Sequence, residues 1–343
     1  MSYSFNEIRL DKGMYGIPGK SFTQVLENLD PSENYVGTPV ENLDAFQRQL
    51  KRFDIHVKGA GSDMVEKFFQ TTDSAVLFPE YVSRAVRAGM EEGNILPSII
   101  ATTTRFDGLD YRSVYTANTD DEKSLRKVGE GALIPATEIK TSDHSVHLHK
   151  RGRMLIASYE AIRFQRLDLF GVMLRQIGAQ IMRMHLEDAI DILINGDGNN
   201  NAAAAFTVGD AAIGGTAGSL SYSDLVAFWN QFDPYTMNTM LASPDVTAKI
   251  LACDEFCNPL TGLNFPGTGE PGSPLGAKLL RSSAVPAGTL IGLDHRYALE
   301  MVQAGDVSVE YDRLIDRQLE RAAITSISGF AKLYTEASNT LTV

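Results

Sequence analysis

Cysteine is scarce in this 343-residue sequence, which contains only Cys253 and Cys257. The two lie four positions apart, and no histidine or further cysteine is clustered beside them, so the ligand spacing of a zinc site is missing. We therefore expect both thiols to be reduced and structural, with a redox role as the alternative.

Long hydrophobic runs and a secretory signal are also missing. No stretch of about 18 consecutive apolar residues occurs, as a membrane-spanning helix requires, and the opening MSYSFNEIRLDK contains no apolar signal-peptide core. We expect folding in a cytoplasm and no membrane partner. Hydrophobic residues make up 43% and charged residues 22% of the sequence, which indicates a globular chain of one large or two medium domains.

Positive charge is in deficit, with 31 Lys and Arg against 43 Asp and Glu and a net charge of −12. Affinity for nucleic acid comes mainly from basic residues that displace counterions from phosphates, so this charge argues against tight wrapping of DNA or RNA. An acidic surface suits a container wall that does not adhere to its contents, and it suits many ordinary soluble enzymes equally well.

Catalytic signatures are absent as well. The sequence has no G-x-x-x-x-G-K-[ST] phosphate loop, no G-x-S-x-G elbow and no H-E-x-x-H helix. Glu130 and Glu138 are an imaginable acid/base pair, but a polar loop is a poor place to hold two carboxylates in fixed geometry. We expect no catalytic residue, no cofactor and no bound metal.

What the sequence does contain is one long amphipathic segment, from Arg166 to Asn195. Its apolar residues recur at three- to five-residue steps between charged and polar ones, which predicts a helix of roughly 45 Å. These residues are Phe170, Leu174, Ile177, Ile181, Met184, Ala189 and Leu193. We expect the helix to end at Gly196-Asp197-Gly198, because glycine adopts the left-handed backbone that terminates helices.

Residues 1–75 are broken by glycine and proline, which predicts an extended or loosely helical arm. Two short amphipathic pieces, Phe22–Leu29 and Leu43–Phe53, interrupt it. The segment is too broken to form a core of its own, so we expect its apolar faces to be buried against the body or a neighbouring chain.

A helix is predicted at Glu80–Met90, followed by strands at Ile95–Thr104 and Leu109–Tyr115. From Ala117 to Arg153 the chain is strongly polar, with turn signals and pieces of period two, which predicts a long two-stranded flap. An isolated hairpin is marginally stable, so we expect this flap to lie on another subunit.

The rest of the chain alternates short helices, strands and loops. Residues 202–218 and 258–276 are expected to be loops by composition, and helices are expected after Ser221 and after Ser243. Residues Asn238–Leu241 form a short apolar piece, and strands are predicted at Leu279–Ser283, Thr289–Asp294, Ala298–Val302, Val307–Tyr311 and Arg321–Tyr334.

This order of parts resembles a tailed-bacteriophage major capsid protein, the α+β fold shared with encapsulins. Three stretches are similar to that family: Ala75–Glu80 before the flap, Val128–Pro135 within it, and Arg321–Tyr334. The resemblance covers about residues 70–343. Residues 1–70 depart from the pattern, since they are longer than a bare arm and lack the coiled-coil helix of a fused scaffolding domain.

The resemblance implies a domain plan with an N-terminal arm, an extended two-stranded loop, a long spine helix in a peripheral domain, and an axial domain. Carried onto this chain, the plan gives the following ranges: 1–75 arm, 76–115 start of the peripheral domain, 116–153 extended loop, 154–220 peripheral domain, 221–305 axial domain, and 306–343 return strands. Since the chain retains Met1, we expect no large N-terminal segment to be removed at maturation.

The implied function is self-assembly into an icosahedral head shell in the virion, built in the host bacterial cytoplasm. The implied partner is the chain itself, in hexamers and pentamers, around double-stranded DNA that is bound without sequence specificity. Portal, scaffolding and decoration proteins are further candidate partners. The alternatives are an encapsulin-type compartment around a cargo enzyme and, from a different class, an enzyme with a helix-braced α+β domain.

Three sets of residues could carry chemistry. His144, His147 and His149 could bind a metal, or they are polar strand residues at an interface. The turn Asn195–Asn199 resembles part of a calcium loop but lacks the downstream glutamate, so we interpret it as a helix end. The resemblance makes flap lysines Lys123, Lys127 and Lys140 candidates for a crosslink to an asparagine of a neighbour, and solvated loop lysines are the alternative.

Overall fold

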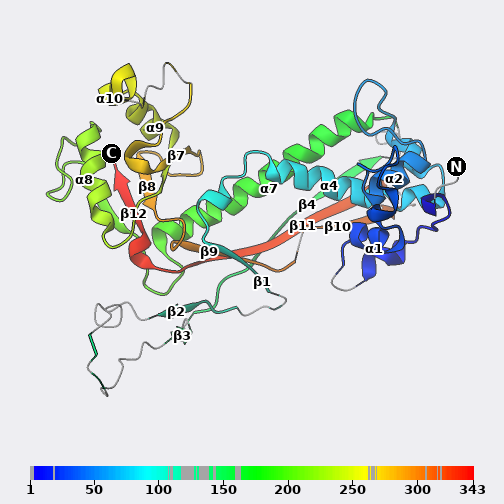
Figure 1. Ribbon diagram of the computed structural model, residues 1–343, viewed down its shortest axis with the longest axis horizontal. Coiled ribbons are helices and arrows are strands. Elements are labelled where there is room, and N and C mark those ends of the chain that lie inside the picture. Colours follow the sequence, from blue (N-terminus) through cyan, green and yellow to red (C-terminus); the bar gives the residue numbers. More distant parts are fainter. Residues whose placement is uncertain are drawn as a thin grey trace. The chain divides into compact units, whose positions relative to one another are not determined.

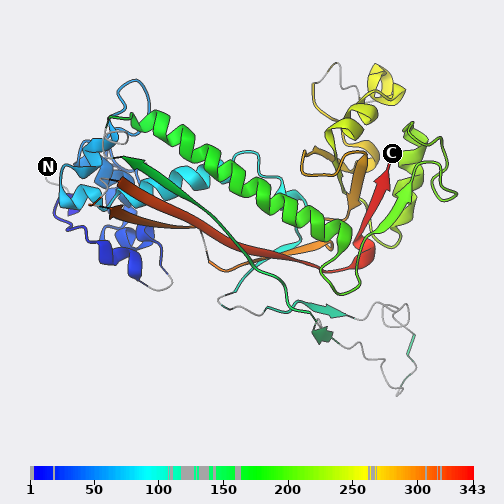
Figure 2. The same ribbon diagram turned by 180° about the vertical axis from the view of Figure 1, so that it is seen from behind.

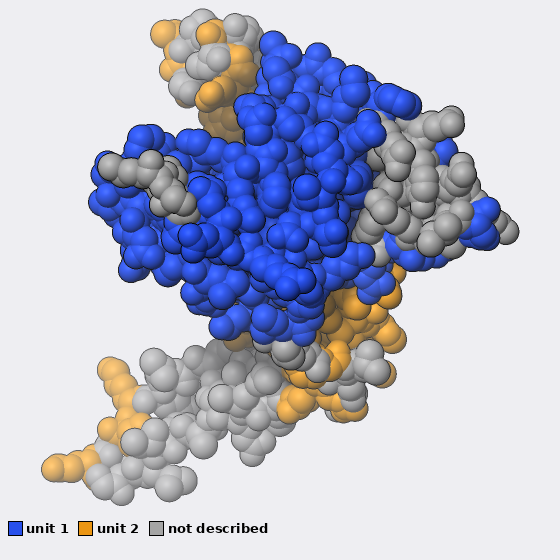
Figure 3. Space-filling model, turned by 90° about the vertical axis from the view of Figure 1, so that its right-hand side faces the viewer, with its two compact units in different colours: residues 1–93, 151–182, 306–326 blue, residues 94–150, 183–305, 327–343 orange. Residues whose placement is uncertain are grey.

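The computed structural model describes residues 4–17, 20–106, 108, 111–116, 127–128, 130, 139–141, 144–158, 164–261, 263, 267, 269–305, 307–314, 316 and 319–343. The chain divides into two compact units, which are coloured separately in Figure 3. Unit 1 comprises Met1–Gly93, Arg151–Met182 and Asp306–Ser326. Unit 2 comprises Asn94–Lys150, Arg183–Gly305 and Ile327–Val343.

The predicted long helix is confirmed as α7, Leu167–Asn195, the longest element described. In unit 1 its buried positions follow the predicted period, with Leu167, Phe170 and Leu174 all directed into the core. The helix ends as predicted: Gly196 has φ of +82°, and its N–H donates to the carbonyl oxygen of Ile192 at 2.9 Å.

Helix α4, Phe78–Glu91, lies beside the first half of α7 in unit 1 (Figures 1 and 2). It begins two residues before the predicted start, because Pro79 sits in the first turn, where no backbone donor is needed. The two backbones touch at glycines. A Cβ added to Gly89 would lie 2.0 Å from the carbonyl oxygen of Arg175, and one added to Gly178 would lie 2.0 Å from that of Val86.

The N-terminal segment of unit 1 is built from short helices, so the expectation of an extended arm is wrong and the loosely helical alternative is correct. Both predicted amphipathic pieces form, as α1, Phe22–Leu29, and α2, Ala45–Arg52, each opened by a capping box. Their apolar faces are buried in the core of unit 1, as expected. The shorter helices are Ser4–Asn6, Lys12–Gly16, Ser32–Tyr35, Val65–Phe69 and Thr72–Ala75.

This segment also has a small core of its own, which the sequence did not predict. Phe5, Tyr35 and Val40 form a separate buried cluster. Beside it Arg48, whose side chain is 0% exposed, donates from Nε to Asp30 Oδ2 at 2.6 Å and stacks over the Tyr35 ring. The buried ion pair between Arg48 and Asp30 therefore orders a segment whose glycines and prolines predicted an irregular arm.

Strands complete unit 1. Strand β10, Ser308–Leu314, pairs antiparallel with the first part of β11, Leu319–Lys332, and β4, His149–Ser158, also pairs with β11. The register sets Val309 opposite Ile324, and Ile324 is fully buried in the core of unit 1.

A five-stranded sheet organises unit 2, in the order β5-β12-β8-β6-β7. The strands are β5 Ala204–Thr207, β12 Ser338–Thr342, β8 Thr289–Leu293, β6 Thr239–Ala242 and β7 Lys278–Arg281. The predicted loop at 202–218 is wrong where it contains β5, and β12 was not predicted. Neither strand alternates apolar and polar residues, so their pairing with each other and with β8 decides their conformation.

Helices cover this sheet's core. They are α8 Tyr222–Trp229, α9 Pro244–Leu251 and α10 Asp254–Cys257, with shorter turns at Leu96–Ser98, Asn230–Phe232, Pro259–Thr261, Pro274–Gly276 and Thr335–Ala337. The predicted caps are confirmed by position, with helices beginning directly after Ser221 and Ser243. Fully buried Phe228 and Phe256 anchor α8 and α10 in the core.

A second group of strands in unit 2 carries the base of the predicted flap. Strand β1, Thr102–Arg105, runs parallel to β9, Leu299–Gln303, and β9 pairs antiparallel with the later part of β11. Strands β2, Val114–Thr116, and β3, Ile139–Thr141, pair antiparallel, so the two-stranded character of the flap is confirmed at its root. Residues 117–126, 129 and 131–138 lie outside the described residues. The predicted strand at Ile95–Thr104 is wrong in its first half, which forms the turn Leu96–Ser98.

No helix in the described ranges combines the length and apolarity needed to cross a bilayer.

Candidate functional site

A buried carboxylate fastens the root of the flap in unit 2. Glu300, on β9, is 5% exposed and accepts three hydroxyl hydrogen bonds. The donors are Thr104 Oγ1 at 2.5 Å, Tyr111 OH at 2.7 Å and Ser113 Oγ at 2.9 Å. Because Tyr111 and Ser113 directly precede β2, this one side chain connects the base of the flap to the sheet beneath it.

The electrostatics of this cluster are unusual, because no lysine or arginine of the described chain forms an ion pair with Glu300. Burial and the hydrogen bond to Glu300 together raise the pKa of Tyr111, so the phenol remains a donor at neutral pH. Removing a donor or the carboxylate leaves buried polar atoms unpaired, which costs more than a surface hydrogen bond contributes. The arrangement can therefore hold the flap root in one position.

A buried lysine closes the end of α7 in unit 2. Lys332, on β11, is 4% exposed, and its Nζ donates to the carbonyl oxygen of Leu193 at 3.2 Å. Its backbone N–H donates to Asp197 Oδ2 at 3.0 Å. Burial lowers the pKa of Lys332 to about 8, although nearby Asp197 favours the charged form. A cation at a helix C-terminus also complements the helix dipole.

The turn after α7 is a helix end rather than an ion site. Asp197 Oδ1 accepts from the N–H of Asn199 at 3.2 Å and from its side-chain amide at 2.8 Å, while Oδ2 accepts from Lys332. Gly198 and Asn200 both have positive φ. These internal bonds occupy the carboxylate that a calcium ion would need, which supports the interpretation as a helix end.

The three predicted histidines are exposed and do not converge with other ligands. The N–H of His144 donates to Asn199 Oδ1 at 3.2 Å, and His149 Nδ1 lies 3.5 Å from Asp188 Oδ2. Across the described ranges, no group of three or more His, Cys, Asp or Glu side chains is placed to hold a metal. Their role at an interface stays a prediction.

The remaining predicted residues do not form a common site. Lys127 and Glu130 are exposed, Lys140 lies on β3, and Lys123 and Glu138 lie outside the described residues. Cys253 and Cys257 are both free thiols. Cys253 is half-buried, and burial raises its pKa, which makes it a poor nucleophile and fits the structural interpretation.

Glu300 and Lys332 were missed by reasoning from the sequence alone. The available signal was a single charged residue inside an apolar strand, as in Leu299-Glu300-Met301 and Ala331-Lys332-Leu333. Such a residue is either exposed at an edge or buried with partners, and only the pairing of distant strands distinguishes the two.

Comparison with known proteins identifies the class. A family model described as phage capsid protein matches residues 142–330, which is more than half of the chain and includes β4, α7, β10 and most of β11. The chain belongs to this phage capsid protein family. Family membership implies a structural, non-enzymatic role, as a component of the virion capsid.

Solved structures share the fold. A virus-like particle from Pyrococcus furiosus has a TM-score of 0.52 at 12% identity, covering 77% of this chain and 99% of that one. Microbacterium phage Oxtober96 has a TM-score of 0.52 at 12% identity, covering 72% and 90%. The capsid of a native GTA particle has a TM-score of 0.51 at 13% identity, covering 72% and 89%. No curated protein matches the chain. The predicted α+β major capsid fold is thus confirmed.

Proposed function

We propose that this chain is the major capsid protein of a tailed phage and that it assembles with copies of itself into the icosahedral shell around the genome. The observation that carries the proposal is the family match over residues 142–330, which contains the long helix and the strands beside it. The phage capsid description of that family favours a phage head over an encapsulin compartment.

The proposed domain roles follow the plan inferred from the sequence. Residues 116–153 are the extended loop, 154–220 with 306–343 the peripheral domain, and 221–305 the axial domain. The division between units at Gly305 and Asp306 supports the last of these boundaries. The unit boundary at Gly93 differs from the proposed arm boundary at residue 75, because α4 packs with the N-terminal helices.

Assembly is proposed to combine several contacts per chain. Heterologous contacts close hexamers and pentamers, and two- and three-fold contacts join these rings. The loop and the N-terminal segment each reach a neighbour, so individually weak contacts become strong together. Assembly takes place in the host cytoplasm, with portal, scaffolding and decoration proteins as partners. The net charge of −12 supports enclosure of double-stranded DNA without tight binding.

Electron microscopy of the chain expressed alone, with mass photometry of the same sample, tests the proposal. Closed shells, tubes or capsomer rings are the expected result. A uniform monomer or dimer, even with a scaffolding protein supplied, would refute the proposal. Shells that copurify with a cargo protein and no nucleic acid would favour a compartment instead.

The role of the loop has its own test. Replacing residues 117–138 by Asn-Gly joins β2 to β3 through a two-residue hairpin, which keeps the root at Thr116 and Ile139 paired. We expect a soluble, folded subunit that fails to form shells. The matched control replaces residues 264–268 by Gly-Ser-Gly-Ser-Gly. Normal shells from the 117–138 variant would show that the loop is dispensable.

A further inference from the structure

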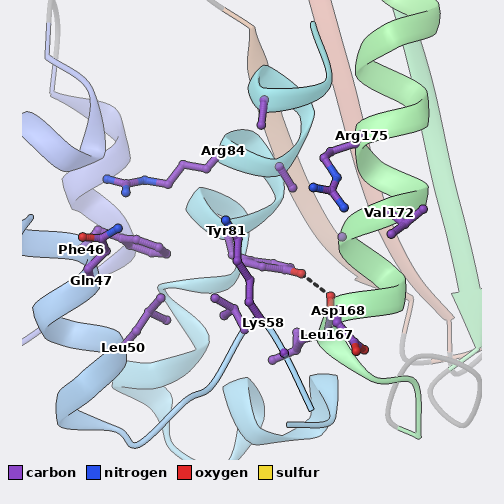
Figure 4. Close-up of a pocket in the computed structure, with 15 residues that line it drawn as sticks. Phe46, Gln47, Leu50, Lys58, Tyr81, Arg84, Leu167, Asp168, Val172 and Arg175 are labelled. Atoms are coloured by element: carbon purple, nitrogen blue, oxygen red, sulfur yellow. Dashed lines mark hydrogen bonds between the residues drawn. The ribbon is translucent and has the colours of Figure 1, made fainter. Parts of the chain in front are cut away.

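Unit 1 contains an open pocket of about 550 Å³ between its N-terminal helices and the start of α7 (Figure 4). Its walls come from α2, α4, the first three turns of α7 and the segment Val57–Gly59. The lining residues are Phe46, Gln47, Leu50, Val57, Lys58, Gly59, Tyr81, Arg84, Ala85, Ala88, Leu167, Asp168, Gly171, Val172 and Arg175. This volume lies in the range of binding sites rather than packing defects.

The floor of the pocket is apolar and rigidly supported. Tyr81 crosses it, and its hydroxyl donates to the carbonyl oxygen of Leu167 at 2.6 Å (Figure 4). Gly171 brings α7 so close that an added Cβ would lie 3.1 Å from that hydroxyl. The shape of the pocket is thus fixed by contacts that leave little freedom to collapse.

The mouth carries positive charge that nothing in the described chain neutralises. Arg84 is satisfied by Asp44 at 2.6 Å and Glu80 at 3.0 Å. Lys58 and Arg175 are exposed and have no ion-pair partner among the described residues.

The single acid of the lining does not offset this charge. Asp168 is held by Arg166 at 2.9 Å, so it is already paired. An apolar floor between two free cations favours an occupant that has an apolar side chain and acidic neighbours.

The apolar surface continues beyond the pocket along α7. Val172, in the wall, is 50% exposed, and Leu169 and Met173 beside it are 56% and 47% exposed. One exposed apolar side chain is ordinary, but three adjacent ones at a pocket mouth mark a surface that becomes covered. The occupant therefore extends outside the pocket, as a polypeptide does and a small ligand does not.

We propose that this pocket receives an apolar side chain from a second copy of this chain, whose acidic residues pair with Lys58 and Arg175. The inference rests on the proposed shell function. With 43 acidic and 31 basic residues, a neighbouring copy offers a predominantly acidic surface to these cations. The α2 and α4 walls lie outside the range 142–330 that the family model matches.

Charge reversal and pocket filling test the proposal in the full-length chain. R175E reverses one free cation, and V172W fills the mouth. The matched controls are R183E, an exposed arginine two turns further along α7, and V226W, at an exposed valine of α8 away from the pocket. We expect R175E and V172W to reduce shell yield about tenfold, with R175K and both controls close to wild type. Circular dichroism of unassembled subunits verifies that each variant folds.

A benzophenone amino acid at Val172 identifies the occupant directly. Crosslinking to a peptide of another copy is expected, and changing an acid in that peptide to arginine should restore assembly of R175E. Wild-type shells with unaffected R175E and V172W would overturn this inference and leave the proposed function intact. A crosslink to another protein, or within one chain only, would also overturn it. Wild-type chain that stays monomeric would overturn both proposals.

Discussion

The ammonium group of Lys332 donates a hydrogen bond of 3.2 Å to the carbonyl oxygen of Leu193, in the last turn of α7. The lysine is buried at the C-terminal end of the helix and is joined through its own backbone to Asp197. The helix end and strand β11 are thereby held together by a group whose charge is costly to bury.

This arrangement predicts a pH dependence of stability. Burial lowers the pKa of Lys332 from 10.5 to about 8. Between these values the unfolded chain binds more protons than the folded chain, so the free energy of unfolding contributed by this group rises with pH. The full change is roughly 3 kcal/mol. Urea unfolding of unassembled subunits at pH 7.5 to 10 should show this rise in wild type relative to K332M.

The control for Lys332 is K249M. Lys249 Nζ also donates to a backbone carbonyl, that of Gly218 at 3.2 Å, but at an exposed position. Its removal should leave the pH dependence of wild type unchanged. Parallel curves for wild type and K332M would contradict the assignment.

The close contact between α4 and α7 predicts that a side chain larger than hydrogen at Gly89 lowers the stability of the protein. G89A places a methyl group 2.0 Å from the Arg175 carbonyl oxygen, which neither helix can avoid without separating. We expect a loss of about 1–3 kcal/mol in unfolding free energy, or insoluble protein. G61A, where an added Cβ meets nothing within 4 Å, should change stability by less than about 0.5 kcal/mol. Equal melting temperatures for the two variants would disprove the close contact.

The hydrogen bonds to Glu300 predict that this buried carboxylate protects the flap root from local unfolding. E300Q keeps an acceptor oxygen but turns a donor amide toward hydroxyl donors, which should cost about 1–3 kcal/mol. Trypsin should then cleave faster after Arg105 and Arg112, which both lie within the segment 104–113 that hydrogen-bonds to Glu300. E187Q, an exposed glutamate on α7, is the control. Unchanged cleavage in E300Q would argue that the root is held by other contacts.

Arg48 predicts that the N-terminal segment depends on one buried ion pair. R48M removes the cation paired with Asp30, which is 2% exposed, and leaves that buried carboxylate with only the hydroxyl donors of Ser4 and Tyr35. The expected cost is about 3–5 kcal/mol. Limited proteolysis should release residues near the N-terminus from R48M before wild type. R9M, at an exposed arginine, should behave as wild type.

Local signals allowed much of the fold to be predicted. The period of α7 and the glycine at its end are properties of adjacent residues. Helix α1 has the amphipathic pattern predicted for Phe22–Leu29, and α8 and α9 begin directly after the predicted caps Ser221 and Ser243. Elements of this kind are fixed within a few residues, so periodicity and capping chemistry suffice.

The parts that escaped prediction depend on contacts between distant residues. Glu300 is buried among hydroxyls about 190 positions earlier in the chain, and nothing near it in the sequence indicates them. Arg48 similarly orders a segment whose glycines and prolines indicated an arm. The pocket beside α7 arises where α2 and α4 pack with a helix that begins more than 70 residues after α4 ends and more than a hundred after α2.

Strand β12 lies inside its sheet, between β5 and β8, although its residues 338–342 come last among the five strands. During synthesis β5 and β8 therefore leave the ribosome before β12, and the edges that pair with β12 are unpaired until it is made. The sheet of unit 2 closes only once residue 342 has emerged, and until then two open edges are available to other nascent chains. In a self-assembling capsid protein, pairing of β12 therefore closes two edges that would otherwise promote premature association between chains.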